Sequence, residues 1–328
     1  MKLLYLICVC LAVLLYGCSS GDEPTGDGNL DNTPISVMAE TASSYSKASI
    51  PAGMCDNFKV YAALEMGGER LDVMKGYNVR FVDTDWTYLV DGQHLVYWSG
   101  NADRYMFTAG APIDSVTSIS ATSMTLHMEN NVRGGVLAGT PLEVKKGSAA
   151  FAKPLTLNFR YAHCRVMVAF VNSVAAATAT TITGITLTPT SPIASEANMT
   201  YSYDWSGTLP AATPALDVTA FSSDSFTFAD VTIPEGTSDA VVSSTRYYCI
   251  PFGSNPTGWT VVLSVDSEPK AASFVNNKLW ESGKSYLYIF SLSESQPKLV
   301  KVISYDDPAF DCTDIVPGGV FSNGDMTD

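Results

Sequence analysis

The sequence has few charged side chains, and most of those that it has are acidic. Only 16% of its 328 residues are charged, whereas an ordinary soluble domain has about 25%. The chain carries 19 Lys and Arg against 33 Asp and Glu, which gives a formal net charge of −14. Phosphate recognition needs clustered Lys and Arg. The sequence contains no such cluster, which argues against a nucleic-acid partner.

Long apolar runs are also scarce, and the one clear run lies at the amino terminus. Residues 3–16 are fourteen consecutive apolar residues that follow the basic Lys2. A membrane-spanning helix needs about 20 such residues, whereas the apolar part of a signal peptide has about 7 to 15. The run therefore excludes a polytopic membrane protein, and it predicts that residues 1–17 are a signal peptide.

The end of this run resembles a bacterial lipobox, Leu-Tyr-Gly-Cys at residues 15–18, in which cleavage precedes a Cys that receives lipid. Because acyl chains such as palmitate contribute about 0.8 kcal/mol per buried CH₂, a lipidated Cys18 would hold the protein on a membrane. Asp22 and Glu23 resemble the surface-export signal of Bacteroidetes lipoproteins. The alternatives are an ordinary secretory signal and a plain polar tether. Residues 18–34 have the composition of a flexible linker.

The sequence also lacks the common catalytic and metal-binding motifs. No HExxH, GxSxG, Walker A or GxGxxG pattern occurs, and these patterns mark metalloprotease, hydrolase and nucleotide sites. His94, His127 and His163 lie more than thirty residues apart, and each is expected to have a structural role. We therefore predict that the protein is not an enzyme and that it uses no cofactor and no metal.

Four of the seven cysteines remain once the signal peptide and the lipidated Cys18 are set aside, namely Cys55, Cys164, Cys249 and Cys312. Outside the cytoplasm these four residues could pair in three ways. The apolar surroundings of Cys164 and Cys249 suit buried free thiols equally well. The pairing therefore stays open.

The remainder of the chain shows period-two alternation of apolar residues rather than helical periodicity. The clearest sets begin at Ile35, Phe58, Met124, Leu155, Cys164, Trp259 and Tyr286. Clusters of Gly, Pro, Asn, Asp and Ser separate these sets and are typical of turns, and Ser and Thr together number 65. This pattern predicts an all-β protein of two sandwiches. We assign residues 35–152 and 153–298 to them, and residues 299–328 to a final strand and tail.

Three aromatic residues could serve either to bind carbohydrate or to fill the core. Trp86, Tyr97 and Trp98 lie close together in the sequence, and exposed aromatic rings can stack on sugars. Aromatic residues in strand-rich domains also commonly belong to the core. The sequence leaves both interpretations open.

Four segments together resemble the fimbrillin-like family: Asp-Asn-Phe-Lys-Val-Tyr-Ala at 56–62, the Tyr-Trp and Tyr-Met-Phe-Thr-Ala-Gly-Ala-Pro elements within 97–112, the strand at 157–166, and Gly-Lys-Ser-Tyr-Leu-Tyr at 283–288. The resemblance covers nearly the whole chain. It implies a Bacteroidetes lipoprotein that builds pili or related adhesive appendages, with two transthyretin-like β-sandwich domains.

The resemblance also implies a mode of assembly. A trypsin-like protease would remove the first strand, here Ile35–Glu40, and a strand of the next subunit would fill the groove. Lys47 is the only basic residue between Cys18 and Phe58, so the predicted cut lies between Lys47 and Ala48. The alternative for Lys47 is a solvated loop lysine.

The candidate donor strand runs through Leu299, Lys301 and Ile303, which would share one face of an extended strand. The alternative for this segment is the last strand of the second sandwich.

The function that the sequence favours is that of a non-enzymatic lipoprotein of the outer membrane and cell surface. It would be a pilus subunit or an accessory, tip or anchor pilin that acts in adhesion. Its partners would be other pilin subunits, host or bacterial surface ligands or glycans, and the membrane through its lipid. The alternative is a carbohydrate-binding surface lipoprotein that uses Trp86, Tyr97 and Trp98.

Overall fold

The computed structural model describes residues 33–39, 56–82, 85–173, 176–251, 258–292, 296–306 and 320–321. Within these ranges the chain consists of strands and turns, together with one short 3-10 helix, η2 (Ile113–Ser115). In this part of the chain no helix has the length and apolar character that crossing a membrane requires. The predicted all-β class is confirmed.

A seven-stranded antiparallel sheet forms the centre of the first half of the protein. Its order is β11-β8-β5-β2-β3-β4, and β9 also pairs with β5. Its strands are β2 (Asn57–Met66), β3 (Glu69–Val82), β4 (Asp85–Thr87), β5 (Arg104–Ala111), β8 (Leu137–Gly139), β9 (Leu142–Lys145) and β11 (Phe159–Tyr161). Phe58, Val60 and Ala62 face one apolar cluster, whereas Tyr61 and Ala63 face another. Both faces of this sheet are therefore covered.

Two smaller sheets provide that cover. On one face lies a parallel pair, β1 (Val37–Ala39) with β10 (Leu155–Leu157). On the other face lies a four-stranded antiparallel sheet of order β15-β14-β7-β6. Its strands are β6 (Val116–Ile119), β7 (Ser123–Glu129), β14 (Ile193–Asp204) and β15 (Ala211–Ser222). The first half of the protein therefore has three layers rather than the two of a simple sandwich.

The second half is a sandwich of two sheets around one apolar core. The six-stranded sheet has the order β23-β22-β12-β18-β24, with β19 also on β12. It contains β12 (Cys164–Asn172), β18 (Ala240–Val242), β19 (Tyr247–Cys249), β22 (Lys284–Leu292), β23 (Pro297–Asp306) and β24 (Val320–Phe321). The five-stranded sheet contains β13 (Thr180–Pro189), β16 (Phe226–Thr227), β17 (Val231–Ile233), β20 (Trp259–Val265) and β21 (Glu268–Phe274).

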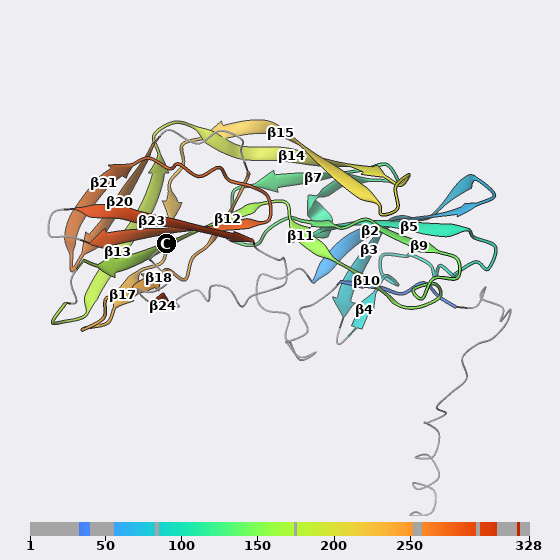
Figure 1. Cartoon of the computed structure of the whole chain (residues 1–328), viewed down its shortest axis with the longest axis horizontal. Helices are drawn as coiled ribbons and strands as arrows, with labels where there is room; N and C mark the ends of the chain where they lie inside the picture. Colours follow the sequence, from blue (N-terminus) through green and yellow to red (C-terminus); the bar gives the residue numbers. More distant parts are fainter. Residues whose placement is uncertain are drawn as a thin grey trace, which may run out of the picture.

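The β14–β15 hairpin connects the two halves. Figure 1 shows it along the top of the molecule, beside β7 of the first half. The register of β14 on β7 pairs Asn198 with His127 and Met199 with Leu126. The division at residue 152 assigns this hairpin to the second sandwich by its position in the sequence. In the structure most of its buried side chains share a core with the first half, whereas Ile193 at its start belongs to the core of the second half.

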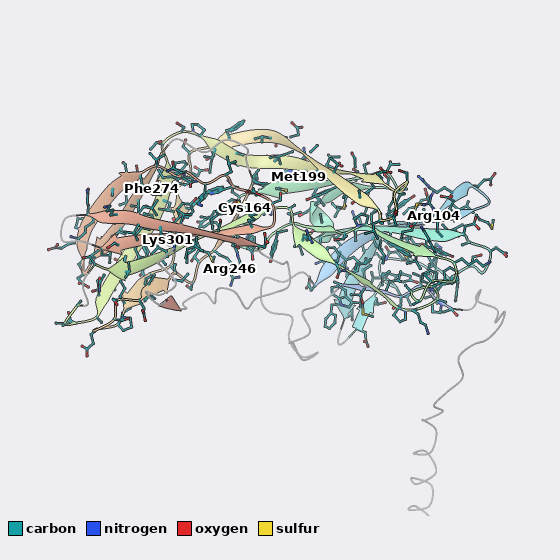
Figure 2. The ribbon with its side chains drawn as sticks, in the orientation of Figure 1. Arg104, Cys164, Met199, Arg246, Phe274 and Lys301 are labelled. Carbon is teal, nitrogen blue, oxygen red and sulfur yellow. The ribbon has the colours of Figure 1, made fainter. Side chains whose placement is uncertain are left out.

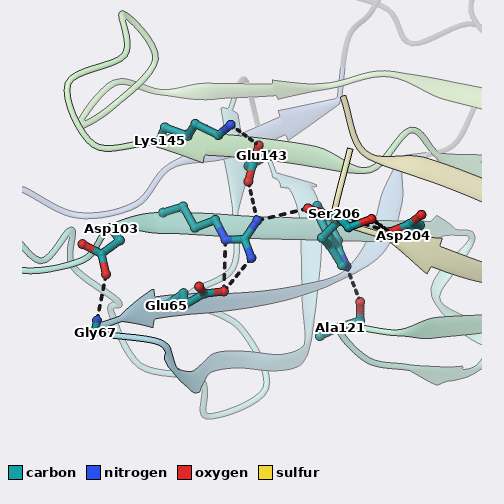
Figure 3. Close-up of polar contacts among 10 residues, drawn as sticks. Glu65, Gly67, Asp103, Ala121, Glu143, Lys145, Asp204 and Ser206 are labelled. Carbon is teal, nitrogen blue, oxygen red and sulfur yellow. Dashed lines mark hydrogen bonds and ion pairs between the residues drawn. The ribbon is translucent and has the colours of Figure 1, made fainter. Parts of the chain in front are cut away.

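Arg104 on β5, labelled in Figure 2, fixes the end of this hairpin to the first half. Figure 3 shows its two carboxylate partners, Glu65 and Glu143. Its guanidinium donates hydrogen bonds to Glu65 at 2.7 Å, to Glu143 at 2.7 Å and to the carbonyl of Trp205 at 3.2 Å. The indole of Trp205 in turn donates to the carbonyl of Ala121 at 2.6 Å. Burial would raise the pKa of Glu143, but its hydrogen bonds from Arg104 and Lys145 hold that pKa below its ordinary value.

We expect Arg104→Met to lower the free energy of unfolding by about 2 to 3 kcal/mol, because it leaves a buried carboxylate without its main partner. The Glu143 side chain is only 7% exposed. The matched variant Lys145→Met removes a partner of the same carboxylate that is 60% exposed, and it should cost under about 1 kcal/mol. Urea unfolding measures both values. Equal losses for the two variants would contradict the assigned role of Arg104.

Candidate functional site

The amino-terminal strand β1 is inserted into the core of the first half. Ile35, Val37 and Ala39 are buried, whereas Ser36 and Met38 between them are only partly buried. The three buried side chains belong to one apolar cluster with the central sheet. Alternation of this kind is what an extended segment shows when one of its faces meets a core. The space that these three side chains occupy is called the β1 slot below.

Main-chain hydrogen bonds hold the segment from both sides. The Ile35 amide donates to the carbonyl of Val96 at 2.7 Å on one side, and the Leu155 amide donates to the carbonyl of Ser36 at 2.8 Å on the other. The hydroxyl of Tyr88 also donates to the carbonyl of Ile35 at 2.8 Å. The segment therefore lies between two extended neighbours instead of at a free edge.

The attachment of β1 comes mostly from its side chains. It pairs with β10 at three positions, Val37 with Leu155, Met38 with Thr156 and Ala39 with Leu157. Burial of one Val or Ile side chain contributes roughly 1.5 to 3 kcal/mol. Another extended segment with apolar residues at alternate positions could make the same contacts, because main-chain bonds carry no sequence information.

The connection from β1 to β2 contains the predicted processing site. Lys47 and Ala48 lie in this connection, outside the described residues. The lipidation candidate Cys18 precedes β1 and also lies outside the described residues. Strand β1 ends at Ala39 and β2 begins at Asn57. A cut between Lys47 and Ala48 would therefore separate β1 from all later strands without interrupting any described strand.

The candidate donor segment forms strand β23, at one edge of the six-stranded sheet. A register irregularity at Val300 breaks its alternation. Leu299 and Val302 pack against the core between the two sheets, whereas Ile303 packs against the apolar cluster on the outer face. Leu299 and Ile303 therefore do not share a face in this strand. Figure 2 shows Lys301 on the same strand.

A comparison with known protein families gives a match over residues 31–304 to the family described as fimbrillin-like. This range covers most of the chain. The chain belongs to the fimbrillin-like family.

Solved structures with a similar fold share little sequence with this fimbrillin-like protein. A proposed cell adhesion protein from Bacteroides uniformis ATCC 8492 has a TM-score of 0.53 and 13% identity, over 84% of this chain and 97% of that one. The fimbrial anchor protein Mfa2 from Porphyromonas gingivalis has 12% identity over 83% of this chain and 96% of that one, but its TM-score is 0.29. The first likeness supports the fold alone, and the second is too weak to support any argument. No protein with a curated description matches the chain significantly.

The three aromatic residues predicted to stack on glycans do not form one exposed platform in this fimbrillin-like protein. Trp98 is 0% exposed, and its ring packs against Tyr105 at a centroid distance of 4.7 Å. Trp86 is partly buried and packs against Phe58 at 5.1 Å. Only Tyr97, at 42% exposed, presents its side chain to solvent. The prediction for Trp98 is therefore corrected, because the core of the first half encloses its indole.

A cavity of about 790 Å³, which sequence reasoning missed, lies in the first half of the fimbrillin-like chain, and Tyr247 of the second half contributes to its lining. Its lining includes Asp114, His127, Glu129, Arg133 and Tyr247. His127 and Glu129 form a contact of 3.3 Å across its wall. The walls come from segments that are far apart in the sequence, and no local motif marks them.

The described part of the chain contains no group of three or more His, Cys, Asp or Glu side chains that could hold a metal ion. The absence of a cofactor, a metal and a catalytic activity stays a prediction from sequence.

Proposed function

We propose that this chain is a non-enzymatic, lipid-anchored surface subunit of a fimbrial fibre, and that it accepts a strand from another subunit into the β1 slot. The observation that carries the proposal is β1 itself. Its three buried side chains alternate along a segment that only three residue pairs attach to β10. Membership of the fimbrillin-like family supports the fimbrial role. The similar fold of a proposed cell adhesion protein agrees with it.

Opening the slot needs a cut in the connection after β1. Without covalent attachment to β2, the amino-terminal segment keeps only its side-chain burial and a few hydrogen bonds. An incoming strand that makes more main-chain pairs would compete for the buried space and for these hydrogen bonds. Lys47 is the one basic residue in this connection, which makes it the proposed site for a trypsin-like protease.

The donor role predicted for Leu299, Lys301 and Ile303 is physically less favourable for this chain than the acceptor role. Strand β23 makes nine residue pairs with β22, three times as many as β1 makes with β10. Seated in a β1 slot, the same three residues would also place the Lys301 ammonium where Val37 lies, and burial of an unpaired charge is costly. We therefore place this subunit at one end of a fibre, where it accepts a strand and keeps its own β23.

Brief trypsin treatment of the full chain tests the proposal. We expect a stable product that begins at Ala48 and that binds a fluorescent synthetic peptide of residues 33–39. The uncut chain should not bind this peptide, because its slot is full. Peptide binding is followed by fluorescence anisotropy, and the new amino terminus is determined by mass spectrometry.

Lys47→Gln is the matched control, since it removes the proposed cut and changes no described residue. It should give no product at Ala48 and no peptide binding after the same treatment. Regular ladders of the cut wild-type protein on gels would instead assign a donating, stalk-like role to β23. A product at Ala48 that never binds the peptide would contradict strand acceptance.

A further inference from the structure

Cys164 and Cys249 lie directly opposite each other on neighbouring antiparallel strands. Cys164 is the first residue of β12, Cys249 is the last residue of β19, and the register pairs the two. Directly opposite residues in an antiparallel pair have Cα atoms about 4.5 to 5.5 Å apart. A disulfide needs a Cα separation of about 4.4 to 6.8 Å. The backbone geometry therefore suits a cross-strand disulfide.

The two side chains also share one environment. Both are buried free thiols in the core between the two sheets of the second half, and Figure 2 marks Cys164 in this region. The Cys164 thiol donates a hydrogen bond to the carbonyl of Cys249 at 3.4 Å. Burial raises the pKa of Cys249, and the neighbouring Cys164 thiol raises it further. The second effect requires that the two thiols lie close together.

We propose that Cys164 and Cys249 form a disulfide when the chain folds in an oxidising compartment. The signal peptide predicted at residues 1–17 would direct the chain to such a compartment. The oxidant is a reactive disulfide, either glutathione disulfide or a thiol–disulfide oxidase. One cysteine thiolate attacks that disulfide and forms a mixed disulfide, and the second cysteine then displaces the remaining thiol. Two thiols lose two protons and two electrons, and the oxidant is reduced to two thiols.

The burial of the pair determines when this reaction can occur. The attacking species is the thiolate, and a raised pKa leaves little thiolate in the folded core. Oxidation therefore precedes the docking of β19 on β12 during folding. The two residues are 85 positions apart, so the bond closes a long loop and restricts the unfolded chain.

The test refolds the full chain from denaturant in a buffer of oxidised and reduced glutathione, followed by digestion without reduction and mass spectrometry. We expect one linked peptide pair that contains Cys164 and Cys249. The melting temperature of this protein should lie roughly 5 to 15 °C above that of protein refolded with dithiothreitol. Alkylation of both residues after oxidative refolding, or a link from either one to Cys55 or Cys312, would overturn the proposal.

Paired variants separate this bond from other redox effects. The double variant Cys164→Ala, Cys249→Ala should melt at the same temperature with and without dithiothreitol. The double variant Cys55→Ala, Cys312→Ala should keep the shift of the wild-type protein. If the first double variant does not fold, the linked peptides of the wild-type chain still decide the question.

Discussion

Replacing Val37 with aspartate is expected to detach strand β1 and to destabilise the first half of the protein by about 3 to 5 kcal/mol. The Val37 side chain is 2% exposed, and it lies between Ile35 and Ala39 in the β1 slot. A carboxylate at this position has no cationic partner supplied by β1, whose sequence is Val-Met-Ala. Because a buried unpaired charge is unfavourable, the segment should leave the slot, and the burial of Ile35 would be lost with it.

The matched control is Ser36→Asp, which adds the same charge one residue earlier on the partly buried side of the segment. We expect it to cost under about 1 kcal/mol. Urea unfolding gives the two free energies. Hydrogen exchange localises the change, because the Leu155 amide donates to the carbonyl of Ser36 and should lose its protection only in Val37→Asp. Similar free energies for both variants would mean that the slot does not hold β1 as described.

The same variant separates strand release from proteolysis. If the β1 slot accepts strands, uncut Val37→Asp protein should bind the peptide of residues 33–39 without any trypsin treatment. Uncut wild-type protein should not bind it. Binding only after trypsin treatment, even in Val37→Asp, would indicate that the cut changes something other than the occupancy of the slot.

Much of the strand content could be predicted from sequence because it follows a local rule. Apolar residues at alternate positions mark a strand with one buried face, and the sets that begin at Phe58, Met124 and Trp259 all lie in strands. The β14–β15 hairpin escaped this rule. Ala, Ser and Thr dominate it, so the contrast between its two faces is weak. Its partner β7 is also distant in sequence, and such pairing has no local signal.

The prediction that Trp98 stacks on glycans was wrong, and part of the reason can be read from the sequence. Neighbouring residues of an extended chain point to opposite sides, so Tyr97 and Trp98 could not both face solvent on one surface. The structure exposes Tyr97 and buries Trp98. Which of the two faces the core depends on the packing of the 85–98 segment against the central sheet. That packing is tertiary information.

His163 follows β11 and forms hydrogen bonds with the segment that lines the cavity. Its imidazole is fully buried, with Nδ1 accepting a hydrogen bond from the Val136 amide at 2.9 Å. Nε2 lies 3.2 Å from the carbonyl of Glu129, which requires a proton on Nε2. Both neighbours line the cavity. The neutral ring satisfies these two main-chain groups, whereas a second proton on Nδ1 would break the bond to Val136.

Acidification is therefore expected to destabilise the protein through His163. Burial lowers the pKa of His163 from 6.5 to about 4, although the hydrogen bond to Glu129 opposes this shift. Between these values the unfolded chain binds the proton and the folded chain does not, so stability falls as the pH drops through this window. The full difference between the two pKa values corresponds to about 3 kcal/mol of folding stability. Roughly 2 to 3 kcal/mol of this stability should be lost between pH 7.5 and 4.5.

His163→Gln isolates this contribution, because glutamine retains one acceptor and one donor but does not titrate. The variant should be less stable than the wild-type protein at pH 7.5, and it should then lose roughly 2 to 3 kcal/mol less on acidification to pH 4.5. His127→Gln, at the exposed wall of the same cavity, should keep the acid loss of the wild-type protein. Urea unfolding at both pH values measures these differences. If His163→Gln shows the full acid loss of the wild-type protein, the acid sensitivity arises from carboxylates such as Glu143 and not from the buried imidazole.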